Sequence, residues 1–286
     1  MPELPEVDAL ARFLAERTTG ATIVRAELAT FAALKTFDPP LDALIGRAIE
    51  GWQRRGKYLA ADLGGLWLAT HLARGGWIQW REQLATGRPK LGKGPLALRV
   101  GLDTGSGFDI TEQGTEKRLA IWVVRALDDI EGIARLGPDP LSPDFDRDAL
   151  GRVLSGRAGN VKTVLTDQSV LAGVGNAYSD EALHLARMSP FKPVAKLTDD
   201  DVDRLYQALV HVLGDASERS AGLPAAGLKG EKRSGMRVHG RTGQACPECG
   251  DTVREVSFAT KSLQYCPTCQ TGGKTLADRR LSKLLK

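Results

Sequence analysis

Four cysteines near the end of the chain constrain its fold more than any other feature. They form two C-x-x-C pairs separated by sixteen residues: Cys246, Cys249, Cys266 and Cys269. Thiolates two residues apart in a tight turn can bind one ion, and four of them complete the tetrahedral shell of a structural zinc. The spacing therefore predicts one structural Zn2+ with a small module folded around it. A redox-active pair or merely buried cysteines are the alternatives.

The zinc module lies in the basic part of the chain. Residues 229–286 hold 12 Lys/Arg and 5 Asp/Glu, a net charge of +7, whereas the remaining residues together carry −3. A local positive surface attracts a polyanion, so we expect nucleic acid as partner; a solvated charged face is the alternative. The sequence shows neither an apolar run of transmembrane length nor a signal peptide. We therefore expect a cytoplasmic protein with no membrane partner.

The rest of the chain predicts an α+β fold in successive parts. An amphipathic helix over 7–17 precedes short β-like runs between 23 and 124, which favour an antiparallel β-sandwich. Helical patterns then cover 147–154, 161–166, 176–185 and 199–219. Joints rich in Pro and Gly near 137–143 and 222–235 mark the boundaries. The expected parts are a β-sandwich domain (1–135), a helical domain (136–228), a zinc module (229–270) and a basic tail (271–286).

The first residues carry a candidate nucleophile. Removal of Met1 would leave Pro2 as an N-terminal secondary amine beside the carboxylate of Glu3. Such an amine can attack an electrophilic carbon and form an imine. Taken alone the pair is a weak signal, because a proline at position 2 is common and an acid at a helix start usually caps the helix.

A glycine-rich corner precedes the predicted helix 176–185. Gly173 and Gly175 permit a tight turn, and Asn176 can cap the helix that follows. Exposed amides at such a helix start, together with an asparagine side chain, can hold a phosphate. An ordinary helix–turn–helix corner is the alternative.

Taken together and in order, these motifs resemble one family of DNA-repair enzymes. The opening Pro-Glu-Leu-Pro-Glu-Val, the run Arg55-Gly-Lys-Tyr-Leu, the segment from Val161 to Leu183 and the two cysteine pairs are similar to the formamidopyrimidine-DNA glycosylase and endonuclease VIII family. The N-terminus resembles the glycosylase branch. The resemblance covers nearly the whole chain. It implies an N-terminal helix with an antiparallel β-sandwich, a helix–two-turn–helix domain and a β-hairpin zinc finger.

The resemblance also implies an activity and a set of residues. It implies a monomeric, bifunctional DNA glycosylase and abasic-site lyase that repairs damaged double-stranded DNA. Pro2 would attack C1′ of the damaged nucleotide, Glu3 would assist proton transfer, and Lys57 would lie beside the lesion phosphate. Further DNA contacts are implied for Glu6, Lys162 and Asn176. Oxidised purines are the first expectation. An endonuclease VIII-like enzyme for oxidised pyrimidines or abasic sites, or a non-catalytic damage-binding zinc protein, is the alternative.

Several positions depart from the family pattern. Lys261 stands where the family has a phosphate-holding arginine, so we expect it to contact DNA and assist the second elimination. Arg74 replaces a methionine, and Lys117, Arg118 and Leu119 replace Arg-Arg-Phe; all four are expected near the gap left by the flipped base, with Leu119 as wedge. The segment expected to close over 8-oxoguanine, 220–236, is short, which implies an open pocket. The tail is a phosphate contact or a flexible arm.

Overall fold

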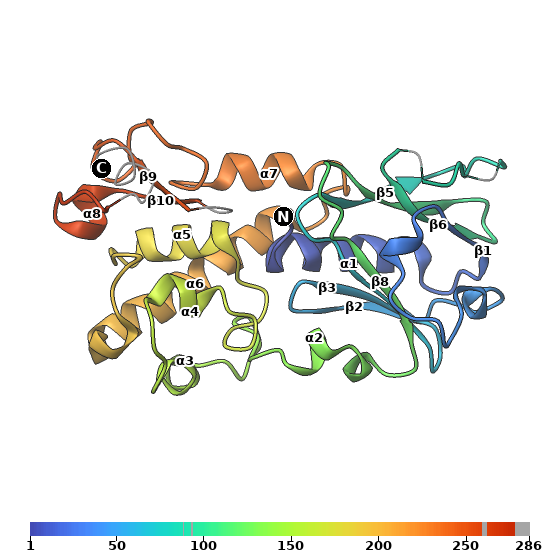
Figure 1. The fold of residues 1–286 in the computed structure, drawn as a ribbon, viewed down its shortest axis with the longest axis horizontal. Helices are drawn as coiled ribbons and strands as arrows, with labels where there is room; N and C mark the ends of the chain where they lie inside the picture. Colours follow the sequence, from blue (N-terminus) through green and yellow to red (C-terminus); the bar gives the residue numbers. More distant parts are fainter. Residues whose placement is uncertain (88, 93, 259–261, 278–286) are drawn as a thin grey trace. The chain divides into compact units, whose positions relative to one another are not determined.

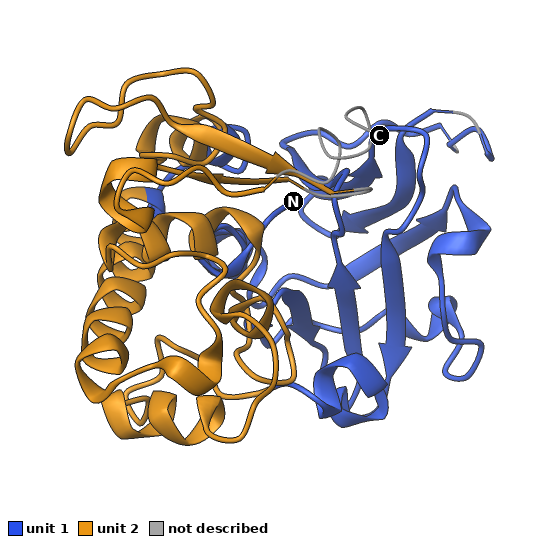
Figure 2. Ribbon diagram, turned by 60° about the vertical axis from the view of Figure 1, so that its left-hand side comes forward, with its two compact units in different colours: residues 1–136, 220–229 blue, residues 137–219, 230–286 orange. Residues whose placement is uncertain are grey.

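The computed structural model describes residues 1–87, 89–92, 94–258 and 262–277 of the 286-residue chain. Two compact units make up the protein: residues 1–136 with 220–229, and residues 137–219 with 230–286 (Figure 2). The chain therefore passes from one unit to the other three times. Within the described ranges, no helix is long and apolar enough to cross a membrane.

Unit 1 begins with helix α1 (Leu4–Thr18). Glu3 and Glu6 form a capping box at its N-terminus, and Pro5 fits the first turn because that turn needs no backbone N–H there. The apolar face expected from the sequence, with Val7 and Leu10 on it, is buried in the core of this unit. The sequence predicted a start at Val7, so the capped first turn is an addition to that prediction.

Two four-stranded antiparallel sheets follow α1 (Figure 1). Their strand orders are β1-β6-β7-β5 and β2-β3-β4-β8. The strands are β1 (Ile23–Leu28), β2 (Gly51–Arg55), β3 (Tyr58–Asp62), β4 (Trp67–His71), β5 (Gly76–Arg81), β6 (Leu96–Leu102), β7 (Gly107–Glu112) and β8 (Ala120–Val124). Short helical turns connect or follow them: η1 (Phe31–Ala33), η2 (Leu41–Leu44), η3 (Leu127–Asp129) and α2 (Glu131–Ala134). The predicted antiparallel sandwich behind an N-terminal helix is confirmed.

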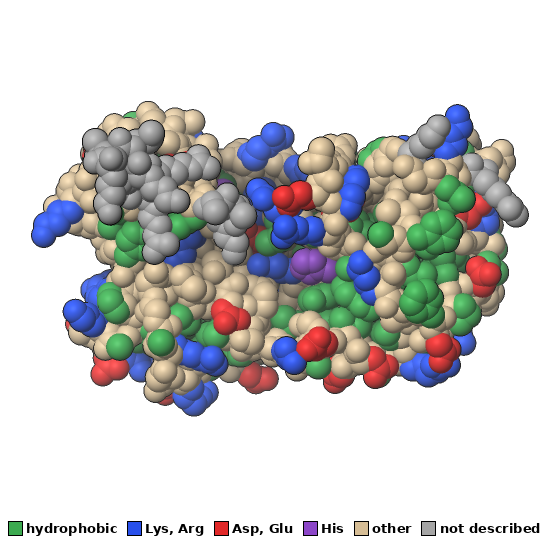
Figure 3. Space-filling view, in the orientation of Figure 1, with side chains coloured by type: hydrophobic (Ala, Val, Ile, Leu, Met, Phe, Trp, Pro, Cys, Tyr) green, Lys and Arg blue, Asp and Glu red, His purple; other side chains and the backbone are tan. Residues whose placement is uncertain are grey.

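The core of unit 1 lies between the sheets and α1, and one part of the surface stays apolar. Leu68 and Phe108 are fully buried in that core. Hydrophobic side chains also gather on the visible surface of the sandwich (Figure 3). Phe31 and Phe37 are among the large apolar side chains that remain exposed.

A segment from far along the chain completes unit 1. Ala225 and Leu228 are buried in its core, although about ninety residues separate them from Leu136. The indole Nε1 of Trp77 donates a hydrogen bond to the Ala225 carbonyl at 3.0 Å, and Lys229 Nζ lies 4.5 Å from the centroid of the same indole ring. The sequence predicted a joint here, whereas the structure packs this stretch against the sandwich.

Helices form most of unit 2 (Figure 1). They are α3 (Arg147–Leu154), α4 (Val161–Leu165), α5 (Asn176–Leu185), η4 (Val194–Lys196), α6 (Asp199–Ser220) and α7 (Leu228–Gly235), whose first two residues belong to unit 1. The four helical patterns predicted between 147 and 219 correspond to α3, α4, α5 and α6. Asp146 caps α3 by accepting from Ala149 N at 2.7 Å, and Asn160 caps α4 by accepting from Thr163 N at 3.0 Å.

The zinc module consists of the hairpin β9 (Arg254–Ser257) and β10 (Ser262–Tyr265), followed by α8 (Pro267–Thr271). Its strands bury Val256 and Tyr265, and Leu276 packs against this cluster. The Tyr265 hydroxyl accepts the Leu276 N–H at 2.8 Å, which ties the chain after α8 to the hairpin. The basic positions of the tail from Arg279 onward lie outside the described residues. The four-part division expected from the sequence stays a prediction.

Candidate functional site

Pro2 and Glu3 lie directly before α1, and both are buried. Glu6 Oε2 accepts the Glu3 N–H at 2.8 Å, as part of the capping box. The positive end of the helix dipole favours a carboxylate at this position. Glu6 is only 1% exposed, so its role in this structure is to hold Glu3 and the chain that leads to Pro2.

Two side-chain contacts fix the direction of α1 along β2. Trp52 Nε1 donates to Thr18 Oγ1 at 2.8 Å, and Arg54 Nε lies 3.6 Å from Asp8 Oδ1. Strand β2 therefore runs antiparallel to α1, and its C-terminal end lies near the N-terminus of the helix. Lys57 follows β2 in the turn to β3 and is 6% exposed. The structure thus places Pro2, Glu3 and Lys57, three of the four residues predicted to be catalytic, at the same end of unit 1.

His71 joins this group, although the sequence analysis gave it no role. It ends β4, where it pairs with Tyr58 across the sheet, and the two rings lie 4.9 Å apart. Burial and the charge of Lys57 lower the pKa of His71 to about 4. The imidazole is therefore neutral near pH 7, and it can share in hydrogen bonding without adding positive charge beside Lys57. His71 lies near Lys57 because the register of β3 and β4 pairs His71 with Tyr58, the residue after Lys57, and the sequence alone does not give that register.

Four predicted gap residues occupy a turn and a loop of unit 1. Arg74, Lys117 and Arg118 are exposed. The buried carboxylate of Glu112 accepts the backbone N–H groups of Arg118 and Leu119 at 2.7 and 2.9 Å, which orders the end of this loop. Leu119 is only 2% exposed and belongs to the core of the unit. The structure therefore does not present Leu119 as a wedge, because entering DNA would require it to leave that core.

Lys162 in unit 2 is also turned inward. Its Nζ donates to Asp180 Oδ1 at 2.7 Å, to Ser179 Oγ at 2.7 Å and to the Asn176 carbonyl at 3.0 Å. These bonds use all three donors of an ammonium group. Lys162 is 8% exposed, so here it secures the start of α5 and does not present its charge to a phosphate.

Asn176 is the first residue of α5, so the helix has the predicted bounds, but Asn176 does not cap it: Gly175 is the N-cap and no side chain caps the helix. Its Nδ2 donates to the Ser262 carbonyl at 2.7 Å, so the residue joins α5 to β10 of the zinc module. Gly173 adopts φ +86° in the preceding turn, a conformation that favours glycine. The side chain of Asn176 is partly exposed at a helix N-terminus, which is compatible with the phosphate contact expected for it.

Two acidic residues of α5 bind the zinc module further. Asp180 Oδ2 lies 2.7 Å from His239 Nδ1 and accepts the Gln264 N–H at 3.2 Å. Glu181 accepts three consecutive backbone N–H groups, from residues 237, 238 and 239, at 2.7–3.0 Å. Burial raises the pKa of Glu181, while the backbone hydrogen bonds act in the opposite direction. Helix α5 therefore holds both the segment 237–239 and strand β10 in place.

The four cysteines are arranged for a tetrahedral metal. Their sulfur atoms all lie within 4.8 Å of one another. Cys249 Sγ is 3.4 Å from Cys266 Sγ, and Cys246 Sγ is 3.9 Å from Cys269 Sγ. Zn–S bonds of about 2.3 Å in a tetrahedron separate the sulfurs by about 3.8 Å, so this donor set fits a structural zinc. Gly250, at φ +76°, donates its N–H to the Cys246 carbonyl and closes the first turn.

A second histidine supports the metal site. His184 Nε2, at the end of α5, lies 3.2 Å from Cys246 Sγ. Burial lowers the pKa of His184 to about 4, so the ring is neutral near pH 7. A neutral ring with its proton on Nε2 can donate to the Cys246 thiolate and orient it. The sequence gave no sign of this contact, because 62 residues separate the partners.

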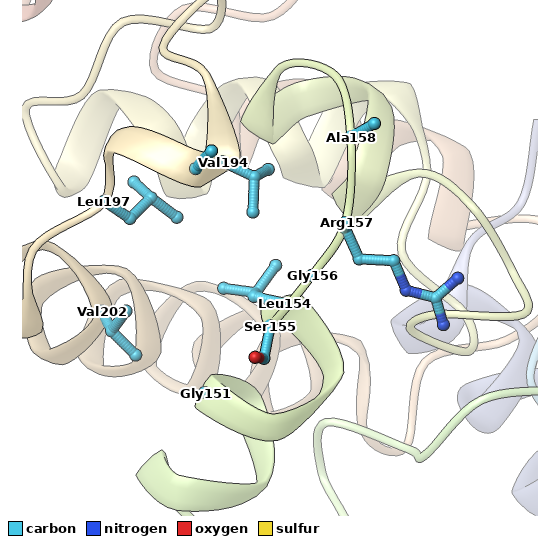
Figure 4. Close-up of a pocket in the computed structure, with 10 residues that line it drawn as sticks. Gly151, Leu154, Ser155, Gly156, Arg157, Ala158, Val194, Leu197 and Val202 are labelled. Carbon is cyan, nitrogen blue, oxygen red and sulfur yellow. The ribbon is translucent and has the colours of Figure 1, made fainter.

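A surface pocket of unit 2 lies outside this arrangement (Figure 4). Its volume is about 480 Å³, and residues of α3, of the stretch after it, of η4 and of α6 line it. Arg157 is its only ionisable lining residue, and Figure 4 shows that side chain pointing away from the apolar ones. The pocket therefore offers no acid–base pair. Lys261, expected at the DNA interface, lies outside the described residues.

Family models match most of the chain in successive segments. The formamidopyrimidine-DNA glycosylase N-terminal domain matches residues 1–114, and the H2TH domain of the same enzymes matches residues 136–224. The zinc finger found in FPG and IleRS matches residues 243–272. These segments contain Pro2 and Glu3, the residues of α5 that bond to the zinc module, and the four cysteines.

Individual relatives agree with this assignment. Formamidopyrimidine-DNA glycosylase of Chloroflexus aurantiacus is 35% identical over 283 residues, which cover 94% of this chain and 98% of that protein. An uncharacterized formamidopyrimidine-DNA glycosylase-like protein of Mycobacterium tuberculosis is 63% identical over 151 residues, covering 53% of this chain and 94% of that protein.

Solved structures agree as well. The MutM (FPG) protein of Thermus thermophilus shares 32% identity with a TM-score of 0.80, covering 96% of this chain and all of that one. A Lactococcus lactis FPG variant in complex with DNA containing Fapy-dG shares 26% identity with a TM-score of 0.83, covering 94% of this chain and all of that one. The chain therefore belongs to the formamidopyrimidine-DNA glycosylase family.

Proposed function

We propose that this protein is a base-excision repair enzyme, a DNA glycosylase and abasic-site lyase that removes oxidised purines from double-stranded DNA. The observation that carries the proposal is the grouping of Pro2, Glu3 and Lys57 at one end of unit 1. The Fapy-dG in the DNA bound by the Lactococcus lactis relative supports oxidised purines as the lesion class. We further propose that the enzyme is monomeric and cytoplasmic.

The chemistry begins once Met1 has been removed. The Pro2 amine attacks C1′ of a nucleotide that has left the base stack, and the bond from C1′ to the base breaks. Glu3 supplies a proton to the opening sugar or to the departing base. The amine loses its own proton, and the C1′–O4′ bond then breaks as O4′ takes up a proton, so that the nitrogen lone pair forms an iminium with C1′. The iminium acidifies the C2′ proton, whose loss expels the 3′ phosphate and cleaves the strand.

Lys57 and His71 support the phosphate side of this reaction. Lys57 lies in the turn after β2, at the end of unit 1 that carries Pro2, and its ammonium contacts the lesion phosphate when DNA is bound. His71 stays neutral beside it, so the two groups do not repel each other. The structural zinc shapes the finger and has no part in these proton transfers.

A broader lesion set is the second candidate, and one observation favours it. Residues 223–228 pack on the sandwich of unit 1 through the Trp77–Ala225 hydrogen bond and the buried Leu228, and the chain continues into α7. This stretch is therefore not a free loop that can fold over a base. Oxidised pyrimidines would then also be accepted.

Borohydride trapping tests the proposal directly. Wild-type protein should form a covalent adduct with duplexes that contain 8-oxoguanine, dihydrouracil or an abasic site, and the strongest signal identifies the lesion class. Pro2→Gly should lose most of the adduct but retain DNA binding, because only the secondary amine changes. Lys35→Gln, which removes another amine on an exposed turn, is the matched control and should trap normally.

Two outcomes would contradict this assignment. An undiminished adduct with Pro2→Gly would identify a different nucleophile. Tight binding with no adduct for any duplex would instead indicate a non-catalytic damage-binding protein. Intact-mass measurement of the same preparation shows whether Met1 has been removed, which the reaction requires.

A further inference from the structure

The turn that carries Lys57 is a hairpin loop of two residues. Strands β2 and β3 pair as far as Arg55 with Tyr58, so Gly56 and Lys57 alone form the loop between them. Gly56 adopts φ +56°, whereas φ of Lys57 is not positive. A positive φ at the first loop position only is typical of a type II′ turn, whereas a type I′ turn requires it at both. The direction of the Lys57 side chain therefore depends on which of the two turns forms.

The peptide group between Gly56 and Lys57 distinguishes these two turns. They differ mainly by a rotation of that group, which reverses the direction of the Gly56 carbonyl. The rotated form would place Lys57 at a positive φ, which is costly for a residue with a side chain. A donor that holds the Gly56 carbonyl therefore fixes the turn, and with it the direction in which the lysine side chain leaves the backbone.

Arg54 supplies this donor. Its Nη1 donates to the Gly56 carbonyl oxygen at 3.3 Å, and its Nε lies 3.6 Å from Oδ1 of Asp8 on α1. The Arg54 side chain is 10% exposed and that of Asp8 is 25% exposed, so water and salt screen their attraction less than they would at the surface. One guanidinium thus contacts both the turn that carries Lys57 and the helix that begins directly after Glu3.

We infer that Arg54 is a positioning residue of the proposed reaction, which holds Lys57 in the direction at which its ammonium meets the lesion phosphate. Arg54 acts through Lys57 and does not itself contact DNA. A planar guanidinium suits this role, because its N–H groups point in fixed directions and can hold two acceptors at once. The inference rests on the proposed function and adds to it the residue that orients one of its groups.

A double-mutant cycle between Arg54 and Lys57 provides the first test. Single-turnover borohydride trapping on an abasic duplex gives the rate of imine formation. Arg54→Met and Lys57→Met should each slow this step by about tenfold to a hundredfold, because a small misplacement of an assisting group is enough to do so. In the Lys57→Met background, Arg54→Met should slow it by less than about threefold further, since no lysine remains to be positioned. Arg12→Met removes the exposed arginine that pairs with the same Asp8 and should leave the rate unchanged.

The salt dependence of binding separates positioning from a general loss of structure. One phosphate contact contributes about 0.9 to the slope of log K against log salt concentration. For a duplex with a stable abasic analogue, Lys57→Met and Arg54→Met should each lower the slope by about this amount, and the double variant should lose no more. A protein that is only destabilised contains fewer active molecules, and its slope stays that of wild type.

Arg54→Lys separates the two contacts of the guanidinium. The ammonium still faces Asp8, so the thermal midpoint should stay near that of wild type. It lacks the fork that also reaches the Gly56 carbonyl, so imine formation should be slower than in wild type and faster than in Arg54→Met.

The outcomes separate this inference from the proposed function. Equal losses from Arg54→Met in the wild-type and Lys57→Met backgrounds would overturn the inference and leave the function standing, because Arg54 would then act independently of Lys57. An unchanged rate and salt slope in Arg54→Met would overturn it as well. If Arg54→Met does not fold, the same comparisons with Arg54→Lys decide the question. If wild type forms no adduct with any duplex, the proposed function fails, and the salt slopes still test the link between Arg54 and Lys57.

Discussion

At the scale of single residues, neighbours decide the charge of each buried ionisable group. Lys162 is buried beside Asp180, whose carboxylate oxygen lies 2.7 Å from its Nζ, an arrangement that stabilises both charges. His71 is buried beside a cation, so it is held neutral. The fold thus pairs the Lys162 ammonium with a carboxylate. It keeps the His71 imidazole uncharged near the proposed site.

His71 should make the protein less stable in mild acid. Its folded pKa is about 4 and its unfolded value is about 6.5, so the unfolded chain binds the extra proton first. The stability contributed by the neutral ring is complete above pH 6.5 and is lost as the pH falls toward 4. The loss should reach up to about 3 kcal/mol. Urea unfolding from pH 7 to 4 should show a shallower decline for His71→Gln than for wild type.

His211 offers the matched control for this measurement. It is exposed on α6, so His211→Gln should follow the wild-type pH dependence. Parallel curves for wild type and His71→Gln would show that burial does not hold His71 neutral. Protonation of the zinc thiolates affects every variant, so only the difference between curves reports on His71.

The sequence predicted residue types and their order better than their orientation. The cysteine pairs were predictable because both members of a pair lie in one turn, where spacing alone fixes the geometry. Lys162 and Leu119 were expected to meet DNA, but the structure turns both inward. The partner that draws Lys162 inward, Asp180, is 18 residues away, and no local pattern reports such a contact.

At the scale of elements, α5 organises the zinc module. Asn176, Asp180 and Glu181 lie near one another along the helix, and each bonds to backbone of the module. Residues four apart share a face of a helix, which explains how Asn176 and Asp180 reach the same strand, β10. These bonds determine where the module sits on the helix.

Asp180→Asn should weaken unit 2 and the placement of the module together. The substitution leaves the Lys162 ammonium buried without its anion, which should cost about 3–5 kcal/mol in the free energy of unfolding. Zinc content should stay at one per chain, because no ligand changes, while DNA affinity falls. Asp215→Asn breaks an exposed ion pair with Arg219 on α6 and should change stability by less than about 1 kcal/mol.

A second variant keeps this prediction testable. Lys162→Met combined with Asp180→Asn removes both charges, so it should recover part of the stability that Asp180→Asn alone loses. Equal stability of wild type and Asp180→Asn would show that the buried pair contributes nothing. Loss of zinc with Asp180→Asn would show that the carboxylate supports metal binding as well as placement.

Helix α7 is one of the elements that were not expected from the sequence. Its sequence, Leu-Lys-Gly-Glu-Lys-Arg-Ser-Gly, contains two glycines and has low helix propensity, so the region 222–235 was predicted as a joint. Leu228 at its first position is fully buried in unit 1, and packing of this residue supports a helix start that propensity does not. By contrast, α3 has a capping residue, Asp146, within its own sequence, and both α3 and α5 were predicted with the observed bounds.

At the scale of the whole molecule, the two compact units are not successive stretches of the chain. Unit 1 is completed by residues 220–229, which come after the helices of unit 2. A sequence boundary near 136 therefore does not separate two independent folding units. The family models match successive stretches of the chain, 1–114 and then 136–224, so their bounds do not show that residues 220–229 pack in unit 1.

Leu228→Ala should consequently destabilise the β-sandwich, although Leu228 is remote from it in sequence. Removing a fully buried leucine should cost about 2–5 kcal/mol. Amide hydrogen exchange should report the loss in β5, whose Trp77 bonds to the same segment. Leu91→Ala removes a leucine that is 60% exposed in unit 1 and should leave exchange unchanged. Faster exchange confined to α7, with β5 still protected, would mean that the returning segment covers the sandwich without stabilising it.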